Sequence, residues 1–204
     1  NVGVVEAIGD GGAAAFDGTP LAVGDRVVPA PNWSCGECEY CRDDYPYYFC
    51  RRLENYGNSL TSTRPPHLFG GWSEYLYLHA GTPVFRVPDG LPTRVAVLTE
   101  LFGVTHSLEM VRQMPRPGGF REGDRVAVVG GGPVGIVHTA KARLMGAADV
   151  IVVDPFEPRL GLNADLGATH TLAARADDPA VLALVRDLTE GRGVDVVVDA
   201  TGHP

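Results

Sequence analysis

The sequence predicts an α/β protein with a β-rich domain followed by a domain built on a doubly wound parallel sheet. Three observations predict this fold. The first half of the chain has short alternating apolar segments, with turn residues about every eight to twelve positions. Strand-like and helix-like segments alternate from Asp124 onward. A glycine-rich turn, Gly130–Gly135, stands between the first strand and the first helix of that series.

In residues 1–97, Gly and Pro separate short segments of alternating polarity, a spacing typical of an antiparallel β barrel or sandwich. The clearest of these segments are Gly24–Pro29, Gly70–Leu78 and Val84–Pro88. The pattern then becomes helical over Thr93–Met114, where apolar residues recur every three or four positions. We place the domain boundary in this stretch and expect domains at 1–106 and 107–204.

The second half predicts a β-α-β-α-β-α-β series, and therefore a parallel sheet. We expect strands at Arg125–Val129, Val150–Val153, Thr169–Leu172 and Val194–Asp199, and helices at Pro133–Met145, Glu157–Leu166 and Pro179–Thr189. Gly146 and Gly167 are placed to end the first two helices, while Asp178 caps the third and Pro179 occupies its first position.

Composition narrows the functional classes. The chain of 204 residues is 45% apolar and 21% charged, as in ordinary soluble domains, and its net charge is −8. Excess negative charge argues against a nucleic-acid or anionic-membrane partner, and no apolar run is long enough to span a bilayer. The N-terminus does not look like a signal peptide, so we expect a cytoplasmic protein with reduced cysteines.

The four cysteines of the chain, Cys35, Cys38, Cys41 and Cys50, lie within sixteen residues among charged side chains. Core packing is a poor explanation for such a polar segment, and two disulfides would suit a small secreted domain. Four thiolates on a short loop, within about 31–55, can instead surround a zinc ion in a closed, structural site. A vacated or redox-active cluster is the alternative.

The turn Gly130-x-Gly132-x-x-Gly135 follows an apolar strand and opens a helix, which is the context of a dinucleotide-binding turn. Asp154 ends the next strand, where its carboxylate would accept hydrogen bonds from ribose hydroxyls and repel a 2′-phosphate. We therefore expect NAD rather than NADP. In the alternative interpretation the glycines serve only packing, and Asp154 caps a helix.

Taken in order, these motifs resemble the zinc-dependent medium-chain alcohol dehydrogenases, in particular the sorbitol and threonine dehydrogenase branch. The resemblance also rests on Val4–Gly9, Gly24–Val28, Gly70–Tyr75 and Gly193–Gly202, and it covers essentially the whole chain. It implies a GroES-like β domain with a structural zinc lobe, followed by a partial Rossmann domain. The implied reaction is reversible hydride transfer between NAD and a secondary alcohol or polyol, with zinc polarising the alcohol oxygen.

The resemblance also implies site residues. Those that bind the cofactor would be Gly130, Gly132, Pro133, Val134, Gly135, Asp154, Arg159 and Thr201. Glu100 would be a ligand of the catalytic zinc or a carboxylate just outside its ligand shell; alternatively it is a surface glutamate, or the alignment slips to Thr99. Arg159 would reach the adenosine ribose, or it is a surface helix arginine.

The chain departs from the family pattern in three ways, and one of them is that the spacing from Glu100 to His106 is one residue short. The last cysteine gap has eight residues where seven are usual, and it carries the aromatic run Tyr45–Phe49. Both ends look cut: the family's catalytic cysteine and its Gly-His-Glu segment would lie just before Asn1, so we expect residues 1–204 to be inactive alone.

Two other functions compete with this interpretation. A zinc-free NADPH quinone or enoyl reductase would share the fold but lack the cysteines, and a non-enzymatic zinc-ribbon module would leave the glycine turn unexplained. Metal content separates the three, with about two zinc ions per dehydrogenase chain, one per ribbon module and none per reductase. We expect a small alcohol or carbonyl substrate, and a homodimer or homotetramer at full length.

Overall fold

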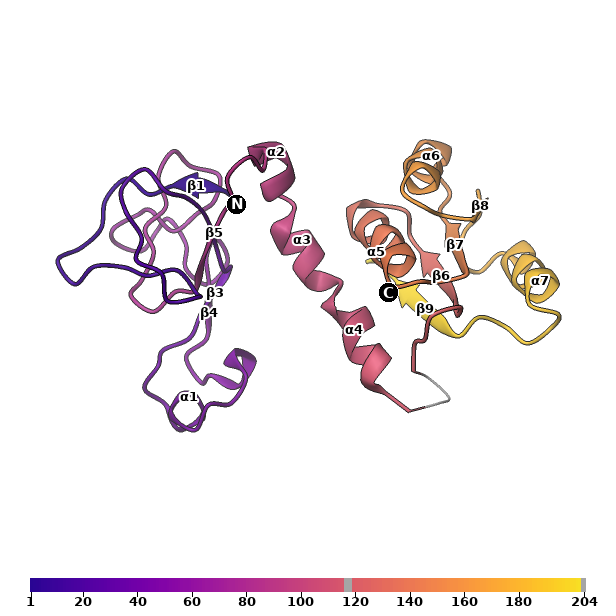
Figure 1. The fold of residues 1–204 in the computed structure, drawn as a ribbon, viewed down its shortest axis with the longest axis horizontal. Coiled ribbons are helices and arrows are strands. Elements are labelled where there is room, and N and C mark those ends of the chain that lie inside the picture. The colour runs from indigo at the N-terminus through magenta and orange to yellow at the C-terminus, as the bar shows by residue number, and fades with distance from the viewer. Residues whose placement is uncertain (116–118, 203–204) are drawn as a thin grey trace. The chain divides into compact units, whose positions relative to one another are not determined.

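The computed structural model describes residues 1–115 and 119–202. The chain forms two compact units, residues 1–100 and 101–204 (Figure 1). No helix in the described ranges is both long and apolar enough to cross a bilayer.

The first unit contains two small antiparallel sheets. One has the order β1-β2-β5 and joins β1 (Gly3–Val4), β2 (Arg26–Pro29) and β5 (Val84–Arg86). The other pairs β3 (Asn32–Trp33) with β4 (Glu54–Asn55). Val28 on β2 packs with Val87 and Ala96 in a small apolar cluster, so burial holds the first sheet in register.

The expectation of a β segment at Gly70–Leu78 is wrong in part, because these residues form bends and coil. The N–H of Tyr77 donates to the carbonyl of Leu68, but the described chain shows no ladder here. Trp72 is fully exposed, and most of its neighbours are exposed too. Alternating polarity produces a strand only where one face is buried against a partner, and this segment has no such face.

The helical stretch predicted at 93–114 is divided into α2 (Thr93–Ala96), α3 (Thr99–Val104) and α4 (His106–Gln113). Threonines stand at both interruptions. The Thr99 hydroxyl donates to the carbonyl of Ala96, and the Thr105 hydroxyl donates to that of Phe102, at 2.7 and 2.6 Å. Such side-chain bonds three residues back compete with the regular i−4 ladder, which explains the breaks.

The second unit is built on the four-stranded parallel sheet that the sequence predicts, and the structure gives its strand order as β8-β7-β6-β9. Its strands are β6 (Arg125–Val129), β7 (Asp149–Val153), β8 (His170–Leu172) and β9 (Val196–Asp199). The chain moves from β6 to β7 on one side and returns to place β9 on the other. Ligands of doubly wound sheets bind where the order reverses, beyond the carboxyl ends of the strands.

The connecting helices also match the prediction, and each ends one residue earlier than expected. They are α5 (Pro133–Leu144), α6 (Glu157–Asp165) and α7 (Pro179–Leu188). Gly146 and Gly167 have positive φ just beyond α5 and α6, and the following N–H groups return to the last helical turns. The carboxylate of Asp178 accepts the N–H of Ala180 and caps α7.

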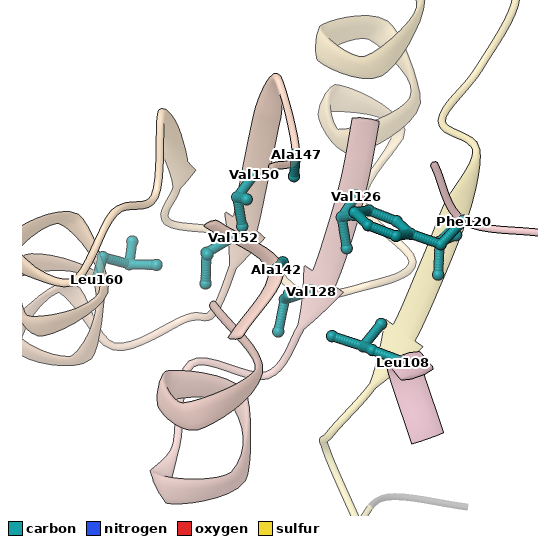
Figure 2. Packing of buried hydrophobic residues seen from close by; sticks show 10 residues of the cluster. Leu108, Phe120, Val126, Val128, Ala142, Ala147, Val150, Val152 and Leu160 are labelled. Atoms are coloured by element: carbon teal, nitrogen blue, oxygen red, sulfur yellow. The ribbon is translucent and has the colours of Figure 1, made fainter. Parts of the chain in front are cut away.

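The core of the second unit lies between β6, β7 and the helices that pack on them (Figure 2). Val126 and Val128 on β6 and Val150 and Val152 on β7 are all inaccessible to solvent. Leu108 from α4 joins the same cluster, so α4 packs into the sheet core. This apolar support fixes the strand ends from which the glycine turn and Asp154 extend.

Candidate functional site

The sulfur atoms of Cys35, Cys38, Cys41 and Cys50 all lie within 4.8 Å of one another. The distance between Sγ atoms is 3.4 Å for Cys38 and Cys41, 3.6 Å for Cys35 and Cys50, and 3.9 Å for Cys35 and Cys41. All four cysteines are free thiols, since a disulfide needs about 2.05 Å. The predicted clustering is therefore present in the fold.

Local structure explains how a short loop gathers four thiols. Cys35 follows β3, and Cys38 and Cys41 lie three residues apart at the start and within α1 (Glu39–Arg42), on one side of the turn. Cys50 follows a 3₁₀ turn, η1 (Tyr47–Phe49), that brings the chain back toward β4. These elements make up the cysteine lobe, residues 31–55.

The eight-residue gap between Cys41 and Cys50 is accommodated by a regular helix ending. Asp44 takes a left-handed conformation with φ of 56°, and the N–H of Tyr45 then donates to the carbonyl of Tyr40 at 2.9 Å. The rings of Tyr40 and Tyr45 meet edge to face, 5.5 Å between centroids. This is the Schellman pattern with its usual apolar contact, so the aromatic run closes the loop and leaves the thiols together.

Hydrogen bonds and burial give the thiols different proton affinities. Main-chain N–H groups, that of Glu37 first, lower the pKa of Cys35 to about 6, and that of Arg51 lowers the pKa of Cys38. Loss of water contact and the neighbouring thiols raise the pKa of Cys41 to about 12. Adjacent thiolates repel one another, so the full set of four negative charges needs a cation between them.

The cluster fits a tetrahedral zinc ion. Zinc–sulfur bonds of about 2.3 Å place the sulfurs of a tetrahedron about 3.8 Å apart, close to the distances found here. The N–H groups of Cys35 and Arg52 both donate to Sγ of Cys50 at 3.4 Å, so two main-chain donors face this sulfur. Four protein ligands leave no open position, so such a site is structural.

The glycine turn occupies the carboxyl end of β6, and its glycines serve different purposes. Gly130 has φ of 96°, and a Cβ there would lie 2.8 Å from the main chain of Ala200 beyond β9. A Cβ on Gly135 would collide with the carbonyl oxygen of Gly130, so α5 can approach the turn only with glycine there. A Cβ on Gly132 would meet nothing within 4 Å, which leaves open space for a ligand to approach the main chain.

The N-terminus of α5 has no side-chain cap among the described residues. Gly132 is the N-cap residue, Pro133 occupies the first helical position, and no side-chain oxygen caps the turn. The N–H groups of Val134 and Gly135 have no acceptor within the helix, and the helix dipole adds partial positive charge. Free N–H groups at such a position bind phosphate oxygens.

Asp154 follows β7 and is 2% exposed. Its Oδ2 accepts the N–H of Gly131 at 2.8 Å and contacts Nη1 of Arg159 at 3.3 Å, while Oδ1 accepts the N–H of Phe156 at 2.8 Å. The Arg159 guanidinium also lies over the Phe156 ring, 4.9 Å from its centroid. Asp154 therefore holds the glycine turn and the segment that leads into α6, in addition to any contact with ribose.

Thr201 and Glu100 are the remaining predicted site residues. The N–H and hydroxyl of Thr201 donate to Oδ1 of Asp199, at the end of β9 and close to Gly130. Thr201 thus stands at the switch point of the sheet. Glu100 is exposed in the first turn of α3. The cysteine lobe is the one group of three or more potential metal ligands within the described ranges, and Glu100 is not part of it.

Two buried polar residues at the glycine turn were not predicted from the sequence. Asn163 on α6 and Thr139 on α5 are both 0% exposed and are bonded to each other. Asn163 lies three residues after Leu160, which is buried in the core. A polar residue at an apolar position of a helix could have indicated from the sequence that Asn163 is buried, but not what it contacts.

Two family models match the chain. The alcohol dehydrogenase GroES-like domain matches residues 1–89, and the zinc-binding dehydrogenase domain matches residues 133–204. They fall on the sheets and cysteine lobe of the first unit and, in the second, on the part of the parallel-sheet domain from α5 onward, which includes β7, β8 and β9. The two matches have the order that the sequence motifs predict.

Among curated proteins, the chain is 32% identical to sorbitol dehydrogenase of Bacillus subtilis, over 98% of this chain and 52% of that protein. It is 34% identical to L-threonine 3-dehydrogenase of Anaeromyxobacter sp., over 99% and 52%. Among solved structures, an alcohol dehydrogenase of Thermotoga maritima superposes with a TM-score of 0.85 at 30% identity, over 99% of this chain and 54% of that one. The chain spans about half the length of the curated relatives it matches.

Proposed function

The chain belongs to the zinc-binding dehydrogenases, and from this premise we propose that its protein transfers a hydride between an alcohol and NAD. The observation that carries the proposal is the pairing of the glycine turn with the cysteine lobe in one chain. We propose a secondary alcohol or polyol as substrate, because the similar curated proteins include a sorbitol and a threonine dehydrogenase.

We propose that Gly130, Gly132, Pro133, Val134, Gly135, Asp154, Arg159 and Thr201 bind the cofactor. NAD, when bound, supplies the carbon that accepts or donates the hydride. The N–H groups at the start of α5 would bind the pyrophosphate, since they have no acceptor within the helix. Asp154, with its charge at the end of β7, would favour a ribose hydroxyl over a 2′-phosphate.

The cysteine lobe would hold one structural zinc through Cys35, Cys38, Cys41 and Cys50. That ion would link β3, α1 and the turn before β4, so its contribution is to the stability of the lobe. We propose Glu100 as a ligand of the catalytic zinc or as a carboxylate just outside its ligand shell. Among the described residues Glu100 belongs to no group of three or more potential ligands, so we derive no step through a catalytic metal.

Further properties are proposed on the same basis. We place the domain division near residue 106, where α4 begins, because Leu108 already packs into the core of the second unit. The protein would act in the cytoplasm, where its four free thiols stay reduced. It would assemble as a homodimer or homotetramer and bind neither nucleic acid nor membrane.

The test uses the protein as its gene encodes it. We expect alcohol-dependent formation of NADH with a panel of secondary alcohols and polyols, together with about two zinc ions per chain. A protein that holds no zinc and reduces quinones or enones with NADPH would instead be the zinc-free reductase. A protein that holds one zinc and binds no dinucleotide would be a zinc-ribbon binding module, and either result would overturn the proposal.

A further inference from the structure

A side chain of α6 that is inaccessible to solvent is hydrogen-bonded to the glycine turn. Asn163 is 0% exposed, and Nδ2 donates to the carbonyl of Gly131 at 3.0 Å. The same amide nitrogen donates to the carbonyl of Arg159 at 2.8 Å. Oδ1 accepts the hydroxyl of Thr139 on α5 at 2.8 Å. Both amide donors and the amide oxygen are thus engaged.

The peptide groups of Gly131 are fixed on both sides. The N–H of Gly131 donates to Oδ2 of Asp154, and its carbonyl accepts a hydrogen bond from Nδ2 of Asn163. Two side chains from the segment between β7 and β8 therefore hold Gly131. A Cβ built on Gly131 would lie 3.0 Å from Nδ2 of Asn163 and 3.2 Å from Cβ of Asp154. The turn therefore rests directly on these two side chains.

Fixing Gly131 has a consequence for its neighbours. Gly132 follows directly and is the N-cap of α5, whose next N–H groups would meet a phosphate. A peptide that could rotate at 131 would change the direction of those N–H groups. Fixed donors bind an anion more tightly than mobile ones, because less conformational freedom is lost on binding.

We propose that Asn163 is a positioning residue for the pyrophosphate of the dinucleotide, acting through Gly131 and held in its rotamer by Thr139. This inference rests on the proposed function, since it assumes that the glycine turn binds a dinucleotide. In this role Asn163 does not touch the dinucleotide itself. It fixes the main chain that binds the pyrophosphate. Thr139 supports the turn indirectly, because its hydroxyl holds the side chain of Asn163.

A purely structural role is the competing explanation, because the Asn163–Thr139 bond also links α6 to α5. The two roles predict different changes in ligand affinity when the contact is lost. Loss of a structural link lowers stability and weakens every ligand of the domain alike. Loss of a positioning contact weakens ligands that carry a pyrophosphate and spares the adenosine part, because Asp154 keeps its bond from the N–H of Phe156.

The test compares ADP-ribose with adenosine as ligands of the full-length protein, each measured by competition with NADH fluorescence. For Asn163→Ala we expect the Kd of ADP-ribose to rise about tenfold, which is about 1.4 kcal/mol, while the Kd of adenosine changes less than about twofold. Thr139→Val should give a smaller loss of the same kind. Thr139→Ser, which keeps the hydroxyl, should restore binding of ADP-ribose.

Thr189→Val is the matched control. Thr189 is also 0% exposed, and its hydroxyl donates to Val185 and accepts the N–H of Gly193, at the end of α7 and away from the glycine turn. This variant should lower the melting temperature and leave the selectivity between the two ligands unchanged. It shows what loss of a buried hydroxyl does to stability alone.

A second measurement uses the close approach of Gly131 to Asn163. Gly131→Ala should raise the Kd of ADP-ribose in the otherwise unchanged protein, because the new methyl displaces the amide. In the Asn163→Ala background the same substitution should have a smaller effect, since that contact is gone. Additive effects of the two substitutions would contradict the proposal.

The outcomes are separable. If the unchanged protein binds neither NADH nor ADP-ribose, the proposed function fails, and the positioning role fails with it. If it binds both but Asn163→Ala and Thr139→Val weaken adenosine and ADP-ribose equally, or neither, only the positioning role is overturned. If Asn163→Ala does not fold, the Thr139→Val and Thr139→Ser pair decides.

Discussion

The carboxylate of Asp154 accepts a 2.8 Å hydrogen bond from the main-chain N–H of Gly131, and this bond ties the end of β7 to the turn that follows β6. Asp154 is almost inaccessible to solvent and has three hydrogen-bond partners in the described chain. A charged group at such a position is tolerated only when it is well bonded. The residue expected to select the cofactor is therefore also part of the support of the turn.

Substitutions of Asp154 should separate these two roles. Asp154→Asn keeps an oxygen for the N–H of Gly131 and removes the charge, whereas Asp154→Ser removes the charge and leaves only a hydroxyl oxygen one bond closer to the main chain, further from that N–H. We expect Asp154→Ser to reduce the preference for NAD over NADP by one to two orders of magnitude, roughly 1.4 to 2.8 kcal/mol. Asp154→Asn should reduce the preference with a smaller loss of total dinucleotide affinity. Dissociation constants for both cofactors check this, and equal binding by the unchanged protein would contradict it.

The cysteine lobe should depend on its metal. Cys38→Ser removes one of four thiolate ligands, so we expect loss of the structural zinc, measured by elemental analysis, and a less stable lobe. A strong chelator should have the same effect on the unchanged protein and make the four thiols reactive to a thiol probe. The parallel sheet of the second unit should remain folded, as judged by dinucleotide binding.

Ser34→Ala is a suitable control for that experiment, because it changes the neighbour of Cys35 without removing a thiolate. It should keep its zinc. A protein that contains no zinc and whose cysteines are paired as disulfides would refute the interpretation of the lobe.

The aromatic loop offers an independent test of the helix ending at Asp44. Left-handed backbone strains a residue with a Cβ, and glycine relieves that strain. We expect Asp44→Gly to stabilise the lobe by about 0.5 to 1 kcal/mol and to slow zinc release to a chelator. Asp43→Gly, at a residue with φ of −91°, should have the opposite effect. If both substitutions accelerate zinc release, the Schellman ending does not govern the loop.

The two central strands of the parallel sheet, β6 and β7, could be predicted closely from the sequence because each is a nearly continuous apolar run with buried side chains. Val150–Val153 is such a run, and the observed β7 extends it by one residue. Gly146 and Gly167 ended the preceding and following helices where expected, since only glycine readily takes the required positive φ. The grouping of the four cysteines was likewise predictable from their spacing.

Other features depend on individual side-chain contacts or missing partners, which the apolar spacing does not reveal. Thr99 and Thr105 interrupt a helix whose apolar spacing is regular, because their hydroxyls bond to main-chain carbonyls. Gly70–Leu78 has strand-like alternation but no partner among the described residues. Asn163 supports the glycine turn from a helix that begins some twenty residues after it, and no local motif announces such a contact.

The last prediction concerns α4 and the unit to which it belongs. Leu108 is 1% exposed and packs with Phe120, Val126 and their neighbours in the sheet core (Figure 2). Removing most of its side chain leaves a cavity that this close-packed core cannot fill, so Leu108→Ala should lower the free energy of unfolding by about 2 to 5 kcal/mol. Met110 on the same helix is 58% exposed, and Met110→Ala should change that free energy by less than about 0.5 kcal/mol.

Denaturant unfolding, followed once by dinucleotide binding and once by zinc release, locates the effect. We expect Leu108→Ala to shift the transition reported by the dinucleotide and to leave zinc release from the cysteine lobe unchanged. This pattern follows if α4 is part of the second domain, as a division near residue 106 requires. Equal shifts of both transitions would mean that α4 stabilises the two domains together, and the proposed division would then have to be abandoned.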